Sequence, residues 1–357
     1  MPDAELEAWL RLALVPGLGG QGLRKLLGDF GLPSQVLGAG RAALTRCVGD
    51  ALAQRILAND GAAAVDAALR WAEAPGRSIA TLSDATYPQQ LLEIPDPPAL
   101  VYVVGDAGLP ARRGLAIVGS RNATPQGVAN AERFARAFSE AGLTIASGLA
   151  LGIDAAAHRG ALTGAGSTVA VLGCGVDVVY PQRNAELYDA VAARGALVSE
   201  FPLGSPPVAA NFPRRNRLIS GLARGVLVVE AALASGSLIT ARLAAEQGRE
   251  VFAIPGSIHS PLSKGCHALI REGAKLVESA QDVLDELKFP VPASTPASPQ
   301  AEKGHAFLAH LGHDPCNVDT LCQRSGLTPD TVSAMLLELE LAGTVAALPG
   351  GRYQRIG

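Results

Sequence analysis

Residues 115–121 read Leu-Ala-Ile-Val-Gly-Ser-Arg, a run of four apolar residues followed by a glycine, a serine and an arginine. A short, continuous apolar run is typical of a strand that is buried on both faces of a parallel sheet. The small residues after it leave room and free backbone amides at the end of the strand. A helical pattern then begins near Gln126, so this stretch predicts a strand–turn–helix unit.

The same unit recurs along the middle of the chain. Further buried strands are predicted at residues 144–146, 168–172, 196–198, 225–229 and 250–254. Helical spacing is found between them, at residues 126–141, 154–163, 185–194, 213–223 and 238–247. This alternation predicts an α/β fold, with a doubly wound, Rossmann-like parallel sheet over residues 80–288. Residues 96–105 are expected to add one more strand.

Two smaller domains are predicted on either side of the sheet domain. Residues 1–75 have helical spacing throughout, and residues 289–302 are a Pro/Ala/Ser-rich linker that cannot bury a core. Residues 303–357 read as helices followed by a Gly-Gly hairpin, which is the pattern of a winged-helix domain. Its second helix, within residues 328–343, contains three carboxylates and no basic residue. Because such a helix repels DNA phosphates, we expect this domain to contact protein or to pack.

The N-terminal segment contains a glycine-rich hairpin. Gly17, Gly19 and Gly22 satisfy the pattern G-x-G-x-x-G of dinucleotide-binding folds. No second strand follows, so two short helices joined by a tight turn are predicted instead, as in the SAM and helix-hairpin-helix group. Either the hairpin amides hold a DNA phosphate, or the glycines only allow the turn.

Composition restricts the class of protein. The chain has 357 residues, a net charge of −3 and 48% hydrophobic residues, which predicts two or three well-buried domains. Its five cysteines are scattered and form no C-x-x-C pair, so no metal site, disulfide framework or cofactor is expected. The acidic start does not resemble a signal peptide, and no apolar run reaches the roughly 20 residues of a membrane span. A cytoplasmic protein is expected.

Small residues and arginines follow the predicted strands. Since ligands of open α/β sheets bind beyond the carboxyl ends of the strands, these residues predict one shared site. Residues 211–224 contain four arginines and no carboxylate, which suits phosphate, and Phe212 can stack on a base. A solvated helix start is the alternative. The predicted binding residues are Gly119, Ser120, Arg121, Ser147, Gly148, Asn211, Phe212, Arg214, Arg215, Asn216, Arg217, Ser235, Gly236 and Ser237.

No catalytic set is evident beside them. The chain has no G-x-x-x-x-G-K-[ST] loop of an NTPase and no G-x-S-x-G elbow around a nucleophilic serine. Asp154 and His158 lie one helical turn apart, but two ligands do not make a metal site. We expect Asp154 to cap a helix and His158 to pack or hydrogen-bond beneath the preceding loop, and we expect no enzyme activity.

Five motifs of the middle segment together resemble the DprA/Smf family of DNA-processing proteins. They are Ile-Val-Gly-Ser-Arg at 117–121, Ser-Gly-Leu-Ala-x-Gly-Ile-Asp-x-x-Ala-His at 147–158, Phe-Pro-x-Arg-Asn-Arg at 212–217, Ser-Gly-Ser-Leu-Ile-Thr-Ala at 235–241 and Val-Phe-Ala-Ile-Pro-Gly at 251–256. The flanking helical domain and winged helix fit a three-part member of that family.

The resemblance implies a protein that binds single-stranded DNA, forms a homodimer, and protects incoming DNA while loading the recombinase RecA during natural transformation. It implies that Arg121 and residues 212–217 contact the strand, with Arg183 and Lys264 as weaker additions. It places the dimer contacts between Val251 and Ile270.

A second hypothesis is an enzyme acting on nucleotides. Phosphoribohydrolases of the lysine-decarboxylase-like type have similar sheets with a Gly-Ser-Arg first turn. They carry a P-G-G-x-G-T-x-x-E motif after a strand, whereas Pro-Gly-Gly occurs here only at residues 349–351, in the predicted wing. Fold analogy alone supports this hypothesis.

Overall fold

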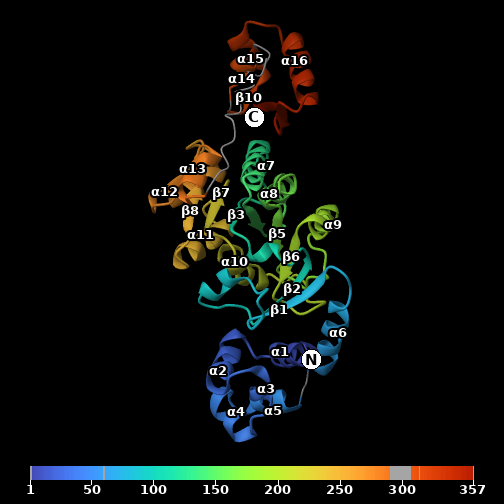
Figure 1. Ribbon diagram of the computed structural model, residues 1–357. Helices are drawn as coiled ribbons and strands as arrows, with labels where there is room; N and C mark the ends of the chain where they lie inside the picture. The colour runs from blue at the N-terminus through green and yellow to red at the C-terminus, as the bar shows by residue number, and fades with distance from the viewer. Residues whose placement is uncertain (1, 59–60, 290–306, 313, 357) are drawn as a thin grey trace.

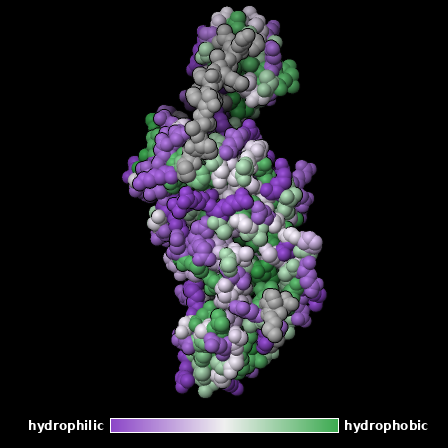
Figure 2. Space-filling model, viewed as in Figure 1, coloured by the Kyte–Doolittle hydropathy of each residue, from purple (hydrophilic) through white to green (hydrophobic). Residues whose placement is uncertain are grey.

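The structure, a computed structural model, describes residues 2–58, 61–289, 307–312 and 314–356. Figure 1 shows helices at the N-terminus in blue, a large sheet flanked by helices in the middle, and a small module at the C-terminus in red. The predicted linker, residues 289–302, lies outside the described residues except for Phe289. On the face shown in Figure 2, hydrophilic and hydrophobic residues are interspersed.

The N-terminal part is helical, as the sequence predicts. Its helices are α1 (Pro2–Ala13), α2 (Gly20–Phe30), α3 (Pro33–Leu37), α4 (Arg41–Val48), α5 (Asp50–Ala58) and α6 (Ala62–Ala72). Their apolar faces share a core that includes Leu12, Leu26 and Leu44. The turn between α1 and α2 requires a glycine at position 17, whose φ is +83°, a value that L side chains rarely adopt.

One large sheet forms the centre of the chain. In chain order its strands are β1 (Arg77–Thr81), β2 (Leu100–Gly105), β3 (Gly114–Val118), β4 (Thr144–Ser147), β5 (Thr168–Val171), β6 (Ala196–Ser199), β7 (Gly225–Val228), β8 (Glu250–Ala253) and β9 (Lys275–Leu276). Their spatial order is β1-β2-β6-β5-β4-β3-β7-β8-β9. All pairs from β6 to β9 are parallel, and β1 and β2 add an antiparallel edge.

Helices cover both faces of this sheet, which confirms the doubly wound prediction. On one face, residues of α10 (Asn211–Gly221), α11 (Ser237–Glu246) and α12 (Lys264–Arg271) pack against Val118 and Val228. On the other face, α7 (Pro125–Glu140), α8 (Ile153–Ala161) and α13 (Ala280–Glu286) pack against Ile117 and Leu227. The helix α9 (Ala185–Arg194) packs against β2 and β6, and its Leu187 and Val191 share a buried cluster with Leu10 and Val65 of the N-terminal helices. The 3-10 turns are η1 (Gln89–Glu93), η2 (Leu109–Ala111), η3 (Gln182–Asn184) and η4 (Pro261–Ser263).

The N-terminal helices pack against the sheet domain. Leu10 and Val65 belong to the same buried cluster as Leu100 and Tyr102 of β2. The indole of Trp9 donates a 3.0 Å hydrogen bond to the hydroxyl of Ser83. The strand β1 begins at residue 77, slightly before the predicted start of the sheet domain at 80. The exact domain boundaries remain predictions.

The C-terminal module has the predicted helix–helix–wing order. Its elements are α14 (Leu308–Leu311), β10 (Cys316–Asn317), α15 (Val318–Ser325), α16 (Pro329–Leu341), β11 (Val345–Leu348) and β12 (Arg352–Arg355). The wing hairpin turns at two glycines of positive φ, Gly350 and Gly351. Leu321 and Leu336 anchor its core. In the described parts of the whole chain, no helix is long and apolar enough to cross a membrane.

Candidate nucleic-acid interface

A cavity opens where the strand order reverses. β3 lies between β4 and β7, so the connections that leave β3 and β7 diverge and open a crevice at their carboxyl ends. We call it the sheet-edge cavity; its volume is about 640 Å³. Its lining includes, from the predicted set, Gly119, Ser120, Arg121, Phe212, Arg215, Asn216, Ser235, Gly236 and Ser237. The structure thus brings together residues that are more than 100 positions apart in the chain.

Hydrogen bonds fix the positions of the two segments that border this cavity, the loop after β3 and the residues after β7. Thr124 is the N-cap of α7 and its hydroxyl accepts a hydrogen bond from the Gly127 amide, while Pro125 occupies the first helical position. The Glu230 carboxylate, at the end of β7, accepts hydrogen bonds from the Thr124 amide and hydroxyl at 2.9 and 2.5 Å. Because Glu230 is largely buried, its pKa is raised. This contact ties the loop after β3 to the end of β7.

Phe212 and Arg121 line the cavity side by side, and Tyr180 next to Phe212 lines a smaller cavity that shares both residues. The Arg121 guanidinium carbon lies 5.5 Å from the ring centroid of Phe212, and the ring of Tyr180 lies 5.7 Å from Phe212 on a tilted plane. A Cβ at Gly173 would approach the Phe212 ring to 2.8 Å, so glycine there makes room for the ring. Arg121 is exposed and Tyr180 is 41% exposed. An exposed cation next to a half-buried ring suits a phosphate followed by a base.

The three arginines of the predicted cluster have different surroundings. Arg215 is only 4% exposed, and its Nη1 donates to the carbonyl oxygens of Gly148, at 2.7 Å, and Val171. Burial lowers the pKa of Arg215 to about 10, while Asp154 opposes the shift. Arg215 therefore holds the loop after β4 and also lines the sheet-edge cavity, and its contact with a phosphate stays a prediction.

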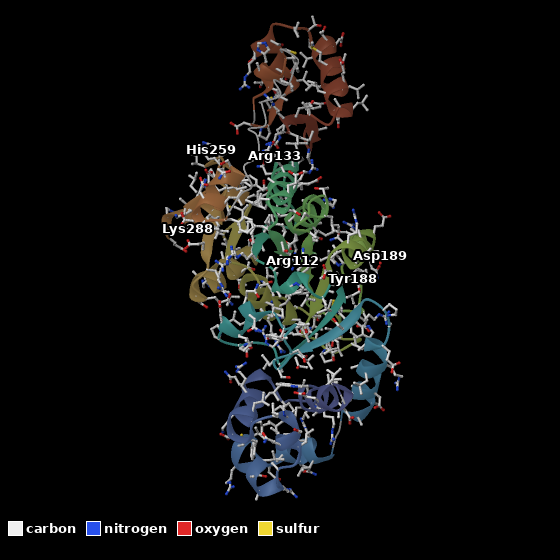
Figure 3. All side chains as sticks on the ribbon, viewed as in Figure 1. Arg112, Arg133, Tyr188, Asp189, His259 and Lys288 are labelled. Carbon is white, nitrogen blue, oxygen red and sulfur yellow. The ribbon has the colours of Figure 1, made fainter. Side chains whose placement is uncertain are left out.

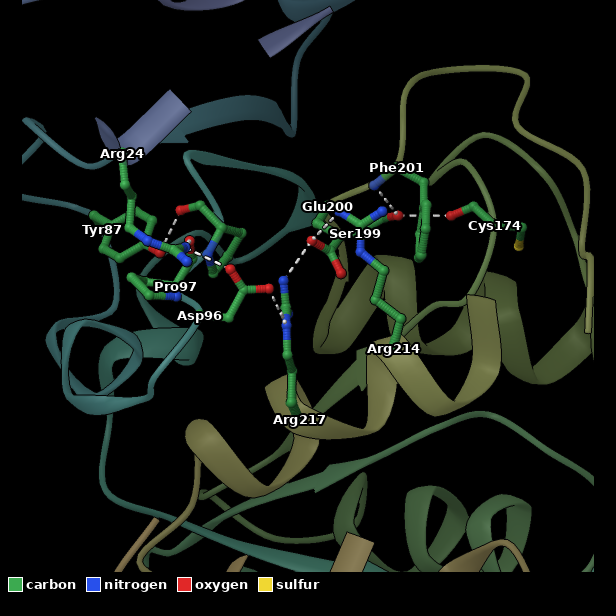
Figure 4. Close-up of polar contacts among 11 residues, drawn as sticks. Arg24, Tyr87, Asp96, Pro97, Cys174, Ser199, Glu200, Phe201, Arg214 and Arg217 are labelled. Carbon is green, nitrogen blue, oxygen red and sulfur yellow. Dashed lines mark hydrogen bonds and ion pairs between the residues drawn. The ribbon is translucent and has the colours of Figure 1, made fainter. Parts of the chain in front are cut away.

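Carboxylates neutralise the other two arginines (Figure 4). Glu200, whose side chain is 3% exposed, pairs with Arg217 at 2.7 Å and with Arg214 at 3.0 Å. Arg217 also pairs with Asp96 at 3.2 Å. Asp96 in turn pairs with Arg24 of α2 at 2.5 Å. Of the three clustered arginines, Arg214 alone has a largely exposed side chain, with half of its surface accessible.

Asp154 and His158 hold the loop after β4; the prediction that Asp154 caps a helix is wrong, because Gly152 is the N-cap of α8 and no side chain caps it. The Asp154 carboxylate accepts the Gly148 amide at 3.1 Å, and His158 Nε2 accepts the Leu149 amide at 3.3 Å. His158 Nδ1 lies 2.7 Å from the Thr168 hydroxyl. Burial lowers the pKa of His158 to about 3 and raises that of Asp154. Among the described residues, no three His, Cys, Asp or Glu side chains are grouped to hold a metal ion.

Several predicted residues lie outside the sheet-edge cavity. Ser147 is buried, and its hydroxyl donates to the Ile117 carbonyl at 2.7 Å, so it points into the sheet. Gly148 makes room for Arg215, because a Cβ there would approach the guanidinium to 2.6 Å. Lys264 lines a separate groove beside α12, and Arg183 is exposed on η3. Asn211 starts α10 at the rim.

Sequence reasoning missed three residues that organise the site. Glu200 and Asp96 pair with the arginines, and the side-chain amide of Asn184 donates to the Leu149 carbonyl at 2.9 Å. Glu200 lies two residues after the predicted strand 196–198, which was a usable signal. Asp96 lies 121 positions from Arg217, and no local pattern marks it.

Comparisons with known proteins agree with this geometry. Residues 78–288 match the family described as DNA recombination-mediator protein A, and residues 291–351 match the DprA winged helix domain. Protein Smf of Escherichia coli is 42% identical over 99% of this chain and 96% of its own length. DNA processing protein DprA of Streptococcus pneumoniae is 49% identical over 58% of this chain and 74% of its own length.

Two solved structures resemble this fold. The DprA structure from Streptococcus pneumoniae has a TM-score of 0.69 and 41% identity, covering 80% of this chain and 97% of that one. DNA processing protein A from Helicobacter pylori, whose structure concerns its single-stranded DNA binding mode, has a TM-score of 0.54 and 31% identity. That match covers 59% of this chain and 96% of the other. This chain belongs to the DprA/Smf family of DNA-processing proteins.

Proposed function

We propose that this chain binds single-stranded DNA in the sheet-edge cavity and loads RecA onto the bound strand, without catalysing a reaction. The observation that carries the proposal is Arg121 beside the Phe212 and Tyr180 rings at the switch point of the sheet. The Helicobacter pylori relative, described by its single-stranded DNA binding mode, supports the choice of ligand. A cytoplasmic location and a role in protecting incoming DNA during transformation belong to the same proposal.

Binding would combine phosphate contacts with stacking. Arg121 and the cavity-lining hydroxyls of Ser120 and Ser237, beside Gly236, hold phosphates, and a base stacks on Phe212. Arg214, the exposed arginine of α10, lies outside the lining of this cavity and adds a phosphate contact to a strand that extends beyond it, while Arg215 forms part of the cavity wall. Lys264 and Arg183 stay weaker candidates. Neither type of contact distinguishes one base from another. The affinity should therefore vary little with the DNA sequence and fall as the salt concentration rises.

The late part of the sheet domain would supply the dimer interface. Exposed apolar side chains gather there, including Leu233, Ile258 and Leu276. A groove beside α12 is lined by Leu233, Pro255, Lys264, His267, Ile270, Arg271 and Leu276. His259 and Lys288 lie on this part of the molecule (Figure 3). A second copy of this chain is the proposed occupant, consistent with the segment from Val251 to Ile270.

A charge reversal tests the DNA site. Arg121→Glu should lower the affinity for a single-stranded oligonucleotide more than tenfold and reduce the slope of binding against salt. Arg133→Glu on α7 is the matched control, because Arg133 is exposed and lies outside the cavity (Figure 3). Each protein is measured with a single-stranded oligonucleotide and with a duplex of the same sequence. If Arg121→Glu, Arg133→Glu and wild type bind the single strand with equal affinity, the proposal is contradicted.

The enzymatic hypothesis has its own test. Incubation with nucleoside monophosphates, followed by chromatography, should show no released base. Release that disappears in the Arg121→Glu variant would favour the nucleotide-processing function instead.

A further inference from the structure

A second cavity lies between the N-terminal helices and the sheet domain. We call it the hairpin cavity; its volume is about 390 Å³. One wall is the glycine hairpin from Leu14 to Gly20, and the opposite walls come from residues 97–102 and 200–202 and from Arg214 and Arg217 of α10. Arg215 and Asn216 of the same helix line the sheet-edge cavity. The helix α10 therefore separates the two cavities.

Three buried polar atoms in the walls of the hairpin cavity have no hydrogen-bond partner among the described residues. They are the Tyr102 hydroxyl, Oε1 of Glu200 and Nη1 of Arg217. Tyr102 is 1% exposed, and the Glu200 side chain is 3% exposed. Because buried polar groups in folded proteins are almost always paired, this set indicates a ligand with both donors and acceptors.

The hairpin adds an anion-binding end to the same cavity. Gly19 is the N-cap of α2 and offers no side chain to the first amides of the helix, whose first turn has no acidic residue. Gly19 and Gly20 both line the cavity. Unpaired amides at the positive end of a helix dipole attract phosphate. Arg214 and Arg217 line the same cavity with Glu200, so its charged side chains, two cations and one anion, leave one net positive charge.

We propose that the hairpin cavity binds one nucleotide of the single strand, a proposal that rests on the function proposed above. Its phosphate lies at the N-terminus of α2 near Arg214, and the edge of its base meets Tyr102, Glu200 and Arg217. Every base has a donor next to an acceptor on its Watson–Crick edge, and this edge is free only in an unpaired strand. The cavity therefore selects single-stranded DNA without reading its sequence.

The geometry implies a length dependence. A helix is about 10 Å across, so a strand that passes over α10 needs on the order of three nucleotides between the two cavities. An oligonucleotide too short to cross α10 uses the sheet-edge cavity alone. A longer one gains affinity from the second contact.

Gly19→Asp tests the phosphate end without threatening the fold. Gly19 has a φ of −74°, and a Cβ there meets no atom within 4 Å. Aspartate is a favoured N-cap, so it occupies the amides, stabilises α2 and repels phosphate. We expect affinity for long oligonucleotides to fall about tenfold, while affinity for short ones stays at the wild-type value.

Gly40→Asp is the matched control. Gly40 is the N-cap of α4 with a φ of −71°, also has open space around its Cβ position, and does not line the hairpin cavity. It adds the same charge and the same type of cap to the same group of helices. The affinity of Gly40→Asp for single-stranded oligonucleotides should equal that of wild type at every oligonucleotide length.

Tyr102→Phe tests the base end. It removes the unpartnered hydroxyl and keeps the ring that packs edge-on against Trp71. We expect the melting temperature to stay equal or rise, and affinity for long oligonucleotides to fall about fivefold.

Wild-type affinity at all lengths for both Gly19→Asp and Tyr102→Phe would show that the cavity holds water only and would overturn the inference. The function proposed above would still stand if Arg121→Glu abolished binding. If the wild-type protein bound no single strand at any length, the function itself would fail, and the inference with it.

Discussion

Nη1 of Arg215 donates a 2.7 Å hydrogen bond to the Gly148 carbonyl and thereby joins α10 to the loop that follows β4. Arg215→Met should lower the free energy of unfolding by about 3 kcal/mol, because it leaves two buried carbonyls without their donor and removes the positive charge that favours the ionised Asp154. Urea denaturation measures the loss. Arg133→Met, at an exposed position, should change stability by less than about 0.5 kcal/mol. An equally small effect of both substitutions would contradict this role of Arg215.

His158 should make the fold sensitive to acid. Its pKa is about 3 in the folded protein and 6.5 ordinarily, so between these values the unfolded chain binds a proton that the folded protein does not. Stability is fully present above pH 6.5 and falls as pH is lowered through this window, by about 3 kcal/mol between pH 6.5 and pH 4.

His158→Gln keeps an acceptor near the Leu149 amide and removes the titrating group. The difference in unfolding free energy between wild type and this variant should therefore shrink as pH falls from 6.5. A difference that is independent of pH would show that His158 titrates normally.

Phe212 should act through stacking. Phe212→Leu should weaken binding of a single-stranded oligonucleotide by about tenfold, since stacking of one base on an aromatic ring contributes about 1–3 kcal/mol. Fluorescence anisotropy measures the affinity. With an abasic oligonucleotide, wild type and variant should bind alike, and a persisting difference would point to a packing defect.

The apolar side chains late in the sheet domain should hold the dimer. Leu276 is exposed there, and Leu276→Glu should convert the dimer to a monomer in sedimentation experiments, because it places a charge in an apolar interface. Leu341→Glu on α16 is the control, since Leu341 is exposed in the C-terminal module. A monomeric wild type would exclude this interface.

The strands were predictable because a parallel strand that is buried on both faces is a continuous run of apolar residues, which can be read directly from the sequence. All six predicted central strands form, and α9 coincides with the predicted segment 185–194. The environment of the arginines was not predictable. Residues 211–224 contain no carboxylate, yet Glu200 and Asp96 reach Arg217 from outside that segment. Local charge patterns describe the chain, whereas ion pairs depend on which distant segments the fold brings together.

The ion pairs that run from Arg24 through Asp96, Arg217 and Glu200 to Arg214 contain three cations and two anions. These groups have one net positive charge, and Arg24 is the one cation among them that comes from the N-terminal helices. Without those helices the remaining four groups would balance to zero. The N-terminal domain therefore supplies the unbalanced cation of these ion pairs, and in a protein shortened to the sheet domain Asp96 would keep Arg217 as its one partner among them.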